Sequence, residues 1–212
     1  LNKNNNKPWF DAHRADYEAA RIDFSNFIQL LIDDLQRSDT TIAGLTSKEC
    51  LFRMNRDIRF TKDKTPYKNN FGASIKRGGK KSPFAGYYFH CSPGTSFAGG
   101  GLWMPESADL KKVRQEIDYN WDEFNSIINE KSFKKTFGDL YNSSEIKLSS
   151  VPKGYEKDNP AIEYLKCKSF IAEMHIPDEQ LIKGYLHRKT VDAFIALQPL
   201  LNFINRAIEI ES

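Results

Sequence analysis

FGASIKRGGKKSPFAGYYFHCSPGTSFAGGGLW, residues 71–103, is the stretch that decides the fold. It holds three runs of mostly apolar, aromatic and small residues, at 71–77, 85–92 and 96–103. Turn signals separate these runs, first Gly-Gly with a following Pro and then Pro-Gly. Short connections favour antiparallel neighbours, because parallel strands need a long crossover. The stretch therefore predicts consecutive strands of an antiparallel meander.

Two further segments carry the period-two pattern of a strand. The first is Leu51–Phe60, with an apolar face made by Phe52, Met54, Ile58 and Phe60. Its polar face holds Arg53, Asn55, Asp57 and Arg59. The second is Ser169–Ile176, where Phe170, Ala172, Met174 and Ile176 share one face. Together with the three runs, these segments predict a sheet of about four to five strands.

Helical periodicity surrounds the predicted strands. The expected helices are one long helix over 8–37, helical pieces from Pro105 to Phe137, a short helix at Pro160–Leu165, a helix from Pro177 to about Leu186, and a last helix over Thr190–Ile208 that Pro199 should kink or split. The order of helix, strands and helices predicts an α+β fold, an antiparallel β-meander packed against N-terminal and C-terminal helices. No clear linker interrupts the pattern, so we expect a single domain over residues 1–212.

The composition is that of a soluble globular protein. Of 212 residues, 40% are hydrophobic and 28% are charged, which argues against disorder. No run of 18 apolar residues predicts a membrane helix, and the first ten residues lack the apolar region of a signal peptide. Three widely spaced cysteines indicate reduced thiols, so we expect a cytoplasmic protein. The first residues resemble the inside of a longer element, so we expect a few residues upstream of Leu1.

Positive charge is concentrated in one part of the chain. Residues 53–81 contain ten Lys or Arg and two Asp, whereas the rest contains 21 basic and 26 acidic residues. A focused basic patch favours an anionic partner such as a phosphate, a nucleotide, a nucleic acid or an acidic protein. The alternative is a solvated surface that acidic residues from elsewhere neutralise in the folded protein.

The polar face of the predicted strand at 51–60 is a candidate anion site. Asp57 lies between Arg53 and Arg59, and nearby guanidinium groups keep a carboxylate ionised. Such a row can bind an anionic substrate, or it can be a structural ladder of ion pairs. Arg56 falls on the apolar face, which predicts a β-bulge or a buried ion pair with an acid of the first helix such as Asp16.

The following segment, residues 61–68, predicts a basic loop. Lys62, Lys64 and Lys68 are candidate anion ligands, and Tyr67 is a candidate proton donor. The alternative is a solvated loop without a function.

Further along the chain, His90 should share a strand face with Tyr88, and Lys76 and Trp103 can join that face by the same alternation. His90 is a candidate general base, although a lone histidine on a strand is more often structural. Gly99-Gly100-Gly101 does not match a nucleotide-binding loop and predicts close backbone packing or a bulge. No spacing of His, Cys, Asp or Glu predicts a metal site.

Several segments together resemble a known family. They are RMNRDIRFTKDKTPYKNNFGA at 53–73, the following AGYYFHCSPGTSFAGGGLWMP, the N-terminal NNNKPWFDAHRADYE and the later PKGYEKDNPAIEYLKCKSF. The signature residues are Arg53, Arg56, Asp57, Arg59, Phe60, Lys64 and Tyr67. The chain resembles a conserved domain family of unknown function that occurs in bacteria, with a related region in some longer fungal proteins. This resemblance implies no reaction, no cofactor and no assigned catalytic residue.

Three hypotheses for function follow. In the first, an enzyme or binding protein holds an anionic, phosphate- or nucleotide-like small molecule at the basic sheet face, with no cofactor. The candidate ligand-binding residues are Arg53, Arg56, Arg59, Lys62, Lys64, Lys68 and Trp103, and the candidate catalytic residues are Asp57, Tyr67 and His90. The second is a non-catalytic module for nucleic acid or an acidic protein. The third is that the signature only stabilises the fold. No membrane partner is expected.

Overall fold

The computed structural model describes residues 1–209. In chain order its helices are α1 (Lys7–Ala12), α2 (Arg14–Leu35), the 3₁₀ helix η1 (Thr40–Ile42), α3 (Ser47–Cys50), α4 (Ser107–Tyr119), α5 (Trp121–Asn129), α6 (Lys131–Phe137), the 3₁₀ helix η2 (Ser144–Ile146), α7 (Ile162–Leu165), α8 (Asp178–Leu181) and α9 (Leu186–Glu209). The strands are β1 (Phe71–Ile75), β2 (Gly86–Cys91), β3 (Phe97–Leu102) and β4 (Phe170–His175). Within this part of the chain, no helix is both long and apolar enough to cross a bilayer.

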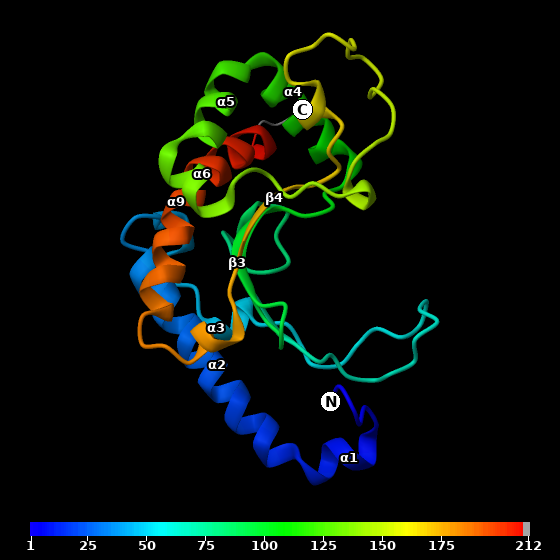
Figure 1. The fold of residues 1–212 in the computed structure, drawn as a ribbon, viewed down its shortest axis with the longest axis vertical. Helices are drawn as coiled ribbons and strands as arrows, with labels where there is room; N and C mark the ends of the chain where they lie inside the picture. The colour runs from blue at the N-terminus through cyan, green and yellow to red at the C-terminus, as the bar shows by residue number, and fades with distance from the viewer. Residues whose placement is uncertain (210–212) are drawn as a thin grey trace.

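The four strands form one antiparallel sheet in the order β1-β2-β3-β4. Tyr88 pairs with Gly99, and Gly99 pairs in turn with Glu173, so these three residues form one row across the sheet. Long helices precede and follow the strands (Figure 1). The α+β fold and the antiparallel meander that the sequence predicts are therefore confirmed.

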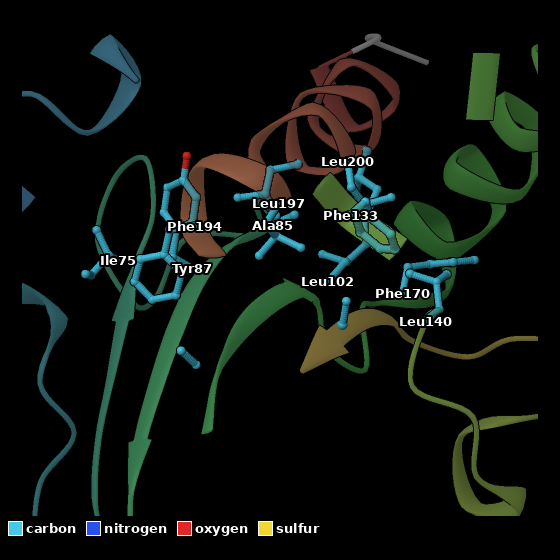
Figure 2. Packing of buried hydrophobic residues seen from close by; sticks show 14 of the residues in the cluster. Ile75, Ala85, Tyr87, Leu102, Phe133, Leu140, Phe170, Phe194, Leu197 and Leu200 are labelled. Carbon is cyan, nitrogen blue, oxygen red and sulfur yellow. The ribbon is translucent and has the colours of Figure 1, made fainter. Parts of the chain in front are cut away.

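Helices cover one face of the sheet. Figure 1 shows α2 and α9 along one side of the strands. In Figure 2, Phe194, Leu197 and Leu200 of α9 pack near Tyr87 and Leu102 of the sheet, and all five side chains are buried. Burial of this apolar face against the helices is the main favourable contribution to folding. Within residues 1–209, no such helical layer covers the opposite face of the sheet over β1 to β3 (Figure 1).

The glycines of β3 are required by the close approach of the neighbouring strands. Gly100 and Gly101 have φ angles of 151° and 128°, which L-amino acids with a side chain rarely adopt. A Cβ atom at Gly100 would lie 2.2 Å from the carbonyl oxygen of Gly86, and one at Gly101 would lie 2.0 Å from that of Phe170. The expectation of close backbone packing is confirmed, and the middle of the sheet carries no side chains along these positions.

The N-terminal helix is not continuous, in contrast to the helix predicted over 8–37. It breaks at His13, whose φ of −114° and ψ of 21° are not helical. The His13 ring donates a hydrogen bond through Nδ1 to the Trp9 carbonyl oxygen at 2.8 Å and stacks on the Trp9 ring. The break turns α1 so that Phe10 stacks on Tyr67 with 4.3 Å between ring centroids.

The predicted strand at Leu51–Phe60 is wrong. Leu51 forms a single bridge to Ala73 at the edge of β1, and the chain then leaves the sheet as an arm, defined here as residues 52–70 (Figure 1). The outgoing leg pairs with the returning leg of the same arm, where Asn55 bridges Tyr67. Phe60 is 94% exposed, so the alternating pattern finds no core to bury its apolar face. The extended segment therefore pairs within the arm and does not join the sheet, which has four strands.

The C-terminal region follows the prediction with shifted boundaries. The helix expected from Pro177 to Leu186 ends earlier, as α8, and α9 begins before Thr190. Pro199 lies inside α9, which remains one helix from Leu186 to Glu209 and is not split there.

Candidate functional site

A cleft of about 730 Å³ lies on the sheet face opposite the helices. Its floor comes from residues of all four strands, and its walls come from the base of the arm, the β1–β2 connection and residues 102–106. Below, the name "cleft" refers to this cavity. Six of its lining residues carry the argument: Arg53, Lys68, Gly72, Lys76, Tyr88 and Glu173.

The Tyr88 side chain lines the cleft, and its hydroxyl group lies over Gly72 of β1, which has no side chain. A Cβ atom at Gly72 would lie only 2.5 Å from the Tyr88 Oη atom. Burial raises the pKa of Tyr88, and the negative charge of Glu173 raises it further. Tyr88 therefore keeps its proton near neutral pH and can donate a hydrogen bond into the cleft.

His90 lies next to Tyr88 on the same strand face. Its Nδ1 atom is 3.3 Å from Asn70 Nδ2 and 3.4 Å from the Tyr88 hydroxyl oxygen, and its ring stacks on Phe97. Burial lowers the pKa of His90 below its ordinary value. A neutral imidazole that accepts a hydrogen bond at Nδ1 fits this geometry. In a charged ring, the Nδ1–H group would face the Asn70 Nδ2 group, and both groups are donors.

Basic side chains gather at the β1 side of the cleft. These are Arg53 and Lys68 from the arm, and Lys76, Lys80 and Lys81 from the end of β1 and the turn after it. Burial lowers the pKa of Lys68, and the like charge of Arg53 adds to this effect. Burial also lowers the pKa of Lys76, whose ammonium group donates a 2.7 Å hydrogen bond to the Ser82 carbonyl oxygen.

Acidic side chains lie at the opposite side. Glu173 comes from β4, and Glu106 and Asp109 come from the start of α4, which follows β3. Burial raises the pKa of Glu173. Because neighbouring strands are about 4.8 Å apart, Glu173 on β4 is separated from β1 by about 14 Å across the sheet. The cleft is therefore polarised along the direction of strand order.

The wall beside Trp103 contains an unusual backbone conformation. Met104 has a φ of 42°, and it is the single non-glycine residue with a positive φ among residues 1–209. Its N–H group donates a 2.9 Å hydrogen bond to the Ser169 hydroxyl oxygen. The Trp103 side chain next to it is 60% exposed and lines the cleft. Sparsely populated backbone conformations often occur at binding sites, which supports this wall as part of a site.

The structure brings three of the candidate ligand-binding residues to the cleft, namely Arg53, Lys68 and Trp103. His90 lies beside the cleft through its contact with Tyr88. The remaining candidates lie in the arm.

Arg56 is paired, but not with Asp16 of the first helix as expected. It donates hydrogen bonds to Asp63 and to the Thr65 hydroxyl group, both within the arm. The guanidinium group lowers the pKa of Asp63 to about 2. The expected partner is wrong because the returning leg of the arm, not α2, lies against Arg56.

Asp57 and Arg59 pair with each other at the exposed end of the arm. Arg59 donates through Nε and Nη2 to the two carboxylate oxygens of Asp57, at 2.9 and 2.6 Å. This pairing lowers the pKa of Asp57, as the sequence predicts, although the two groups do not form a sheet face. Lys64 donates to the Ile58 carbonyl oxygen at 2.8 Å, and Lys62 is exposed.

Tyr67 anchors the arm to the N-terminal segment. Its ring is only 8% exposed and stacks on Phe10. The Asn5 side chain accepts a hydrogen bond from the Tyr67 N–H group and donates one to its carbonyl oxygen. The structure thus places Tyr67 in a packed contact, away from the lining of the cleft.

Sequence reasoning missed Glu173, Lys80 and Lys81 as residues of the site. A signal for Glu173 exists, because it lies on the polar side of the alternating segment Ser169–Ile176. The strand pairing is also needed, because it shows that the Glu173 and Tyr88 side chains lie on either side of Gly99. Within the described residues, no group of three or more His, Cys, Asp or Glu side chains is arranged to hold a metal ion.

Comparison with known proteins identifies the family. The model of the family described as "Conserved hypothetical protein (DUF2461)" matches residues 1–203. The chain belongs to this family. No curated protein and no solved structure matches the chain.

Proposed function

We propose that the cleft binds a small molecule that carries a planar ring and an anionic group, such as a nucleoside monophosphate or another ring phosphate. Small-molecule sites commonly have volumes of about 300–1,000 Å³ and combine apolar walls with a few polar groups. The cleft, at about 730 Å³, has both features. The observation that carries the proposal is the gathering of five basic side chains at one side of an aromatic-walled cavity.

The charge distribution orients the ligand. The anionic group would lie at the β1 side, near Lys68 and Lys76, because these ammonium groups are partly removed from water and an anion restores their favourable interactions. The ring would lie over the glycine-rich part of the floor, between Tyr88 and Trp103. A floor without side chains lets a flat ring approach the backbone closely.

The polar groups of the floor fit hydrogen bonding to the ligand. Tyr88 keeps its proton, and burial raises the pKa of Glu173, so Glu173 gains a proton more readily than an exposed carboxylate. The amino and carbonyl substituents of a ring can form hydrogen bonds with such donors and acceptors. If the protein acts on its ligand, Tyr88 and His90 are the groups placed to move a proton.

Thermal unfolding tests this function. The midpoint would be measured with adenosine monophosphate, with adenosine and with orthophosphate, at low and moderate salt. A ligand at 100 times its dissociation constant should add about 2.7 kcal/mol to the free energy of unfolding. We expect adenosine monophosphate to stabilise the protein more than either of its parts.

Two matched lysine variants localise the effect. Lys76→Met removes a cation that lines the cleft, and Lys62→Met removes an exposed cation of the arm. The stabilisation should be lost in Lys76→Met and kept in Lys62→Met. Equal loss in both variants, or no stabilisation of the native protein by any ring phosphate, would contradict the proposal.

One observation favours a second candidate function, single-stranded nucleic acid binding by the arm. Phe60 is 94% exposed, and the Arg59 guanidinium lies 5.5 Å from its ring centroid. Exposed aromatic rings beside cations can stack on bases. This function predicts that Phe60→Ala weakens binding of an oligonucleotide and that binding falls steeply with salt.

A further inference from the structure

A second cavity meets the cleft at the base of the arm. It has a volume of about 800 Å³ and lies between α2 and α3, lined by Arg21 and Lys48 among others. We name it the α2–α3 groove. Four residues line both the groove and the cleft: Phe52, Arg53, Lys80 and Lys81. The two cavities are therefore neighbours, separated by a ridge that carries three cations.

The groove is lined by basic side chains without acidic ones. Its cations are Arg21, Lys48, Arg53, Lys80 and Lys81. Arg21 has an exposed partner, Glu18, at 3.6 Å. For the other four, no carboxylate of residues 1–209 lies within ion-pair distance. Like charges that line one cavity repel one another, and an anion between them relieves that repulsion.

Glu49 follows Lys48 in sequence but does not line the groove. Glu49 accepts hydrogen bonds from the N–H and hydroxyl groups of Thr46, at 2.9 and 2.7 Å, and so caps α3. These hydrogen bonds lower the pKa of Glu49, and the positive charge of Lys80 adds to this effect. Its carboxylate is therefore engaged at the start of α3.

The ridge and the groove are held in place by specific contacts. The Lys80 ammonium group donates to the carbonyl oxygens of Lys48 and Glu49, at 3.3 and 3.0 Å. The Ser47 N–H group donates to the Gln29 side chain at 2.9 Å, which attaches α3 to α2. A cation fixed by backbone carbonyls needs less ordering when it binds an anion than a free surface lysine does.

We propose that the α2–α3 groove binds the second and further phosphates of a linear phosphoanhydride chain. Arg53, Lys80 and Lys81 would contact the chain where it crosses the ridge, and Arg21 and Lys48 would hold its far end. The inference rests on the proposed function for the end that lies in the cleft, and it names the ligand class as a di- or polyphosphate. The groove offers few rings for stacking, since Tyr17 already stacks on Phe71, so a chain of charges fits it better than nucleobases.

Calorimetric titration tests this site in buffer without divalent cations. The probes are orthophosphate, pyrophosphate, tripolyphosphate, adenosine monophosphate and adenosine triphosphate. We expect affinity to rise by about tenfold for each added phosphate that gains a charge-assisted contact. Equal affinity for orthophosphate and tripolyphosphate would overturn the proposal.

Variants separate the two cavities. Arg21→Ala and Lys48→Ala change side chains that line the groove and not the cleft, whereas Lys76→Met changes the cleft alone. Each groove variant should weaken tripolyphosphate binding by about tenfold and leave adenosine monophosphate binding within about twofold. An equal loss in Lys62→Ala, which lies in neither cavity, would count against a specific site. Circular dichroism checks that each variant is folded.

The probe series also separates the two proposals and the sources of the phosphate chain. Binding of tripolyphosphate without binding of adenosine monophosphate supports the groove and contradicts the proposed function of the cleft. Tighter binding of adenosine triphosphate than of tripolyphosphate identifies a nucleotide as the source of the chain. Tight binding of a single-stranded oligonucleotide, with no binding of tripolyphosphate, would overturn the groove proposal.

Discussion

The arm and the cleft both contain basic and aromatic side chains from the same part of the sequence, but the surroundings of these side chains differ. In the arm, Arg56 and Arg59 are paired with Asp63 and Asp57, and Phe60 is exposed. In the cleft, the basic side chains line an aromatic cavity, and two of them, Lys68 and Lys76, are partly removed from water.

This difference indicates which cations can contribute free energy to ligand binding. A cation that already has an exposed carboxylate partner gains little from an added anion, because exposed ion pairs contribute only about 0–1 kcal/mol. A cation in a partly buried site without a carboxylate gains more, since the anion replaces lost hydration. Charge density along the sequence is therefore a poorer guide to the site than the pairing of each charge in the fold.

The largest expected effect comes from the floor of the cleft. Gly101→Ala would put a Cβ atom 2.0 Å from the Phe170 carbonyl oxygen at a φ of 128°. We expect a loss of about 3 kcal/mol or more in the free energy of unfolding, measured by denaturant titration. Gly184→Ala is the matched control, because nothing lies within 4 Å of its added Cβ atom. Similar stabilities of the two variants would show that the floor is not rigid.

A smaller effect is expected where the arm is anchored. Tyr67→Ala removes a buried ring that stacks on Phe10 and should lower the free energy of unfolding by about 2–4 kcal/mol. Limited proteolysis should then cut within residues 52–70. Because Tyr67 does not line the cleft, residual binding of adenosine monophosphate should follow the folded fraction of the protein. Complete loss of binding in the folded variant would show that the arm and the cleft act as one unit.

Gly72→Ala should affect binding more than stability. The added Cβ atom would displace the Tyr88 hydroxyl group, from which it would be only 2.5 Å away, and the tyrosine ring can move into the cleft. We expect about tenfold weaker binding of the ring phosphate by calorimetry, as for the loss of one good hydrogen bond. Unchanged affinity would mean that the ligand does not contact the floor beside Tyr88.

The smallest effect concerns pH. Because burial raises the folded pKa of Glu173, the unfolded chain releases this proton at a lower pH, and stability falls as pH rises through the ordinary range of a glutamate. Glu173→Gln should remove this loss, so the variant should gain stability relative to the native protein between acidic and neutral pH. The check is thermal unfolding at several pH values. A parallel pH profile of the two proteins would mean that Glu173 is well solvated in the fold.

Much of the fold could be predicted from the sequence because its signals are local. The Gly-Gly and Pro-Gly turns between apolar runs define three of the strands and their antiparallel order. The glycines of β3 also indicated close backbone contact, which Gly100 and Gly101 confirm.

The errors arose where the deciding contact is not local. The alternation at Leu51–Phe60 predicts an extended segment, but it does not say whether a sheet or the returning leg of an arm will pair with it. For the same reason, the sequence alone does not indicate that Arg56 pairs with Asp63 of the returning leg. Glu173 was missed because its place opposite Tyr88 depends on the pairing of β3 with β4, two segments about 70 residues apart in sequence.

The most direct test of the central claim is a titration of the isotope-labelled protein with adenosine monophosphate, followed by nuclear magnetic resonance. The account predicts that chemical shifts change for Gly72, Tyr88 and the Trp103 indole in the cleft, while Phe60 and Lys62 in the arm keep theirs. Changes confined to the arm, with none at Tyr88 or Trp103, would contradict the assignment of the ligand site to the open face of the sheet.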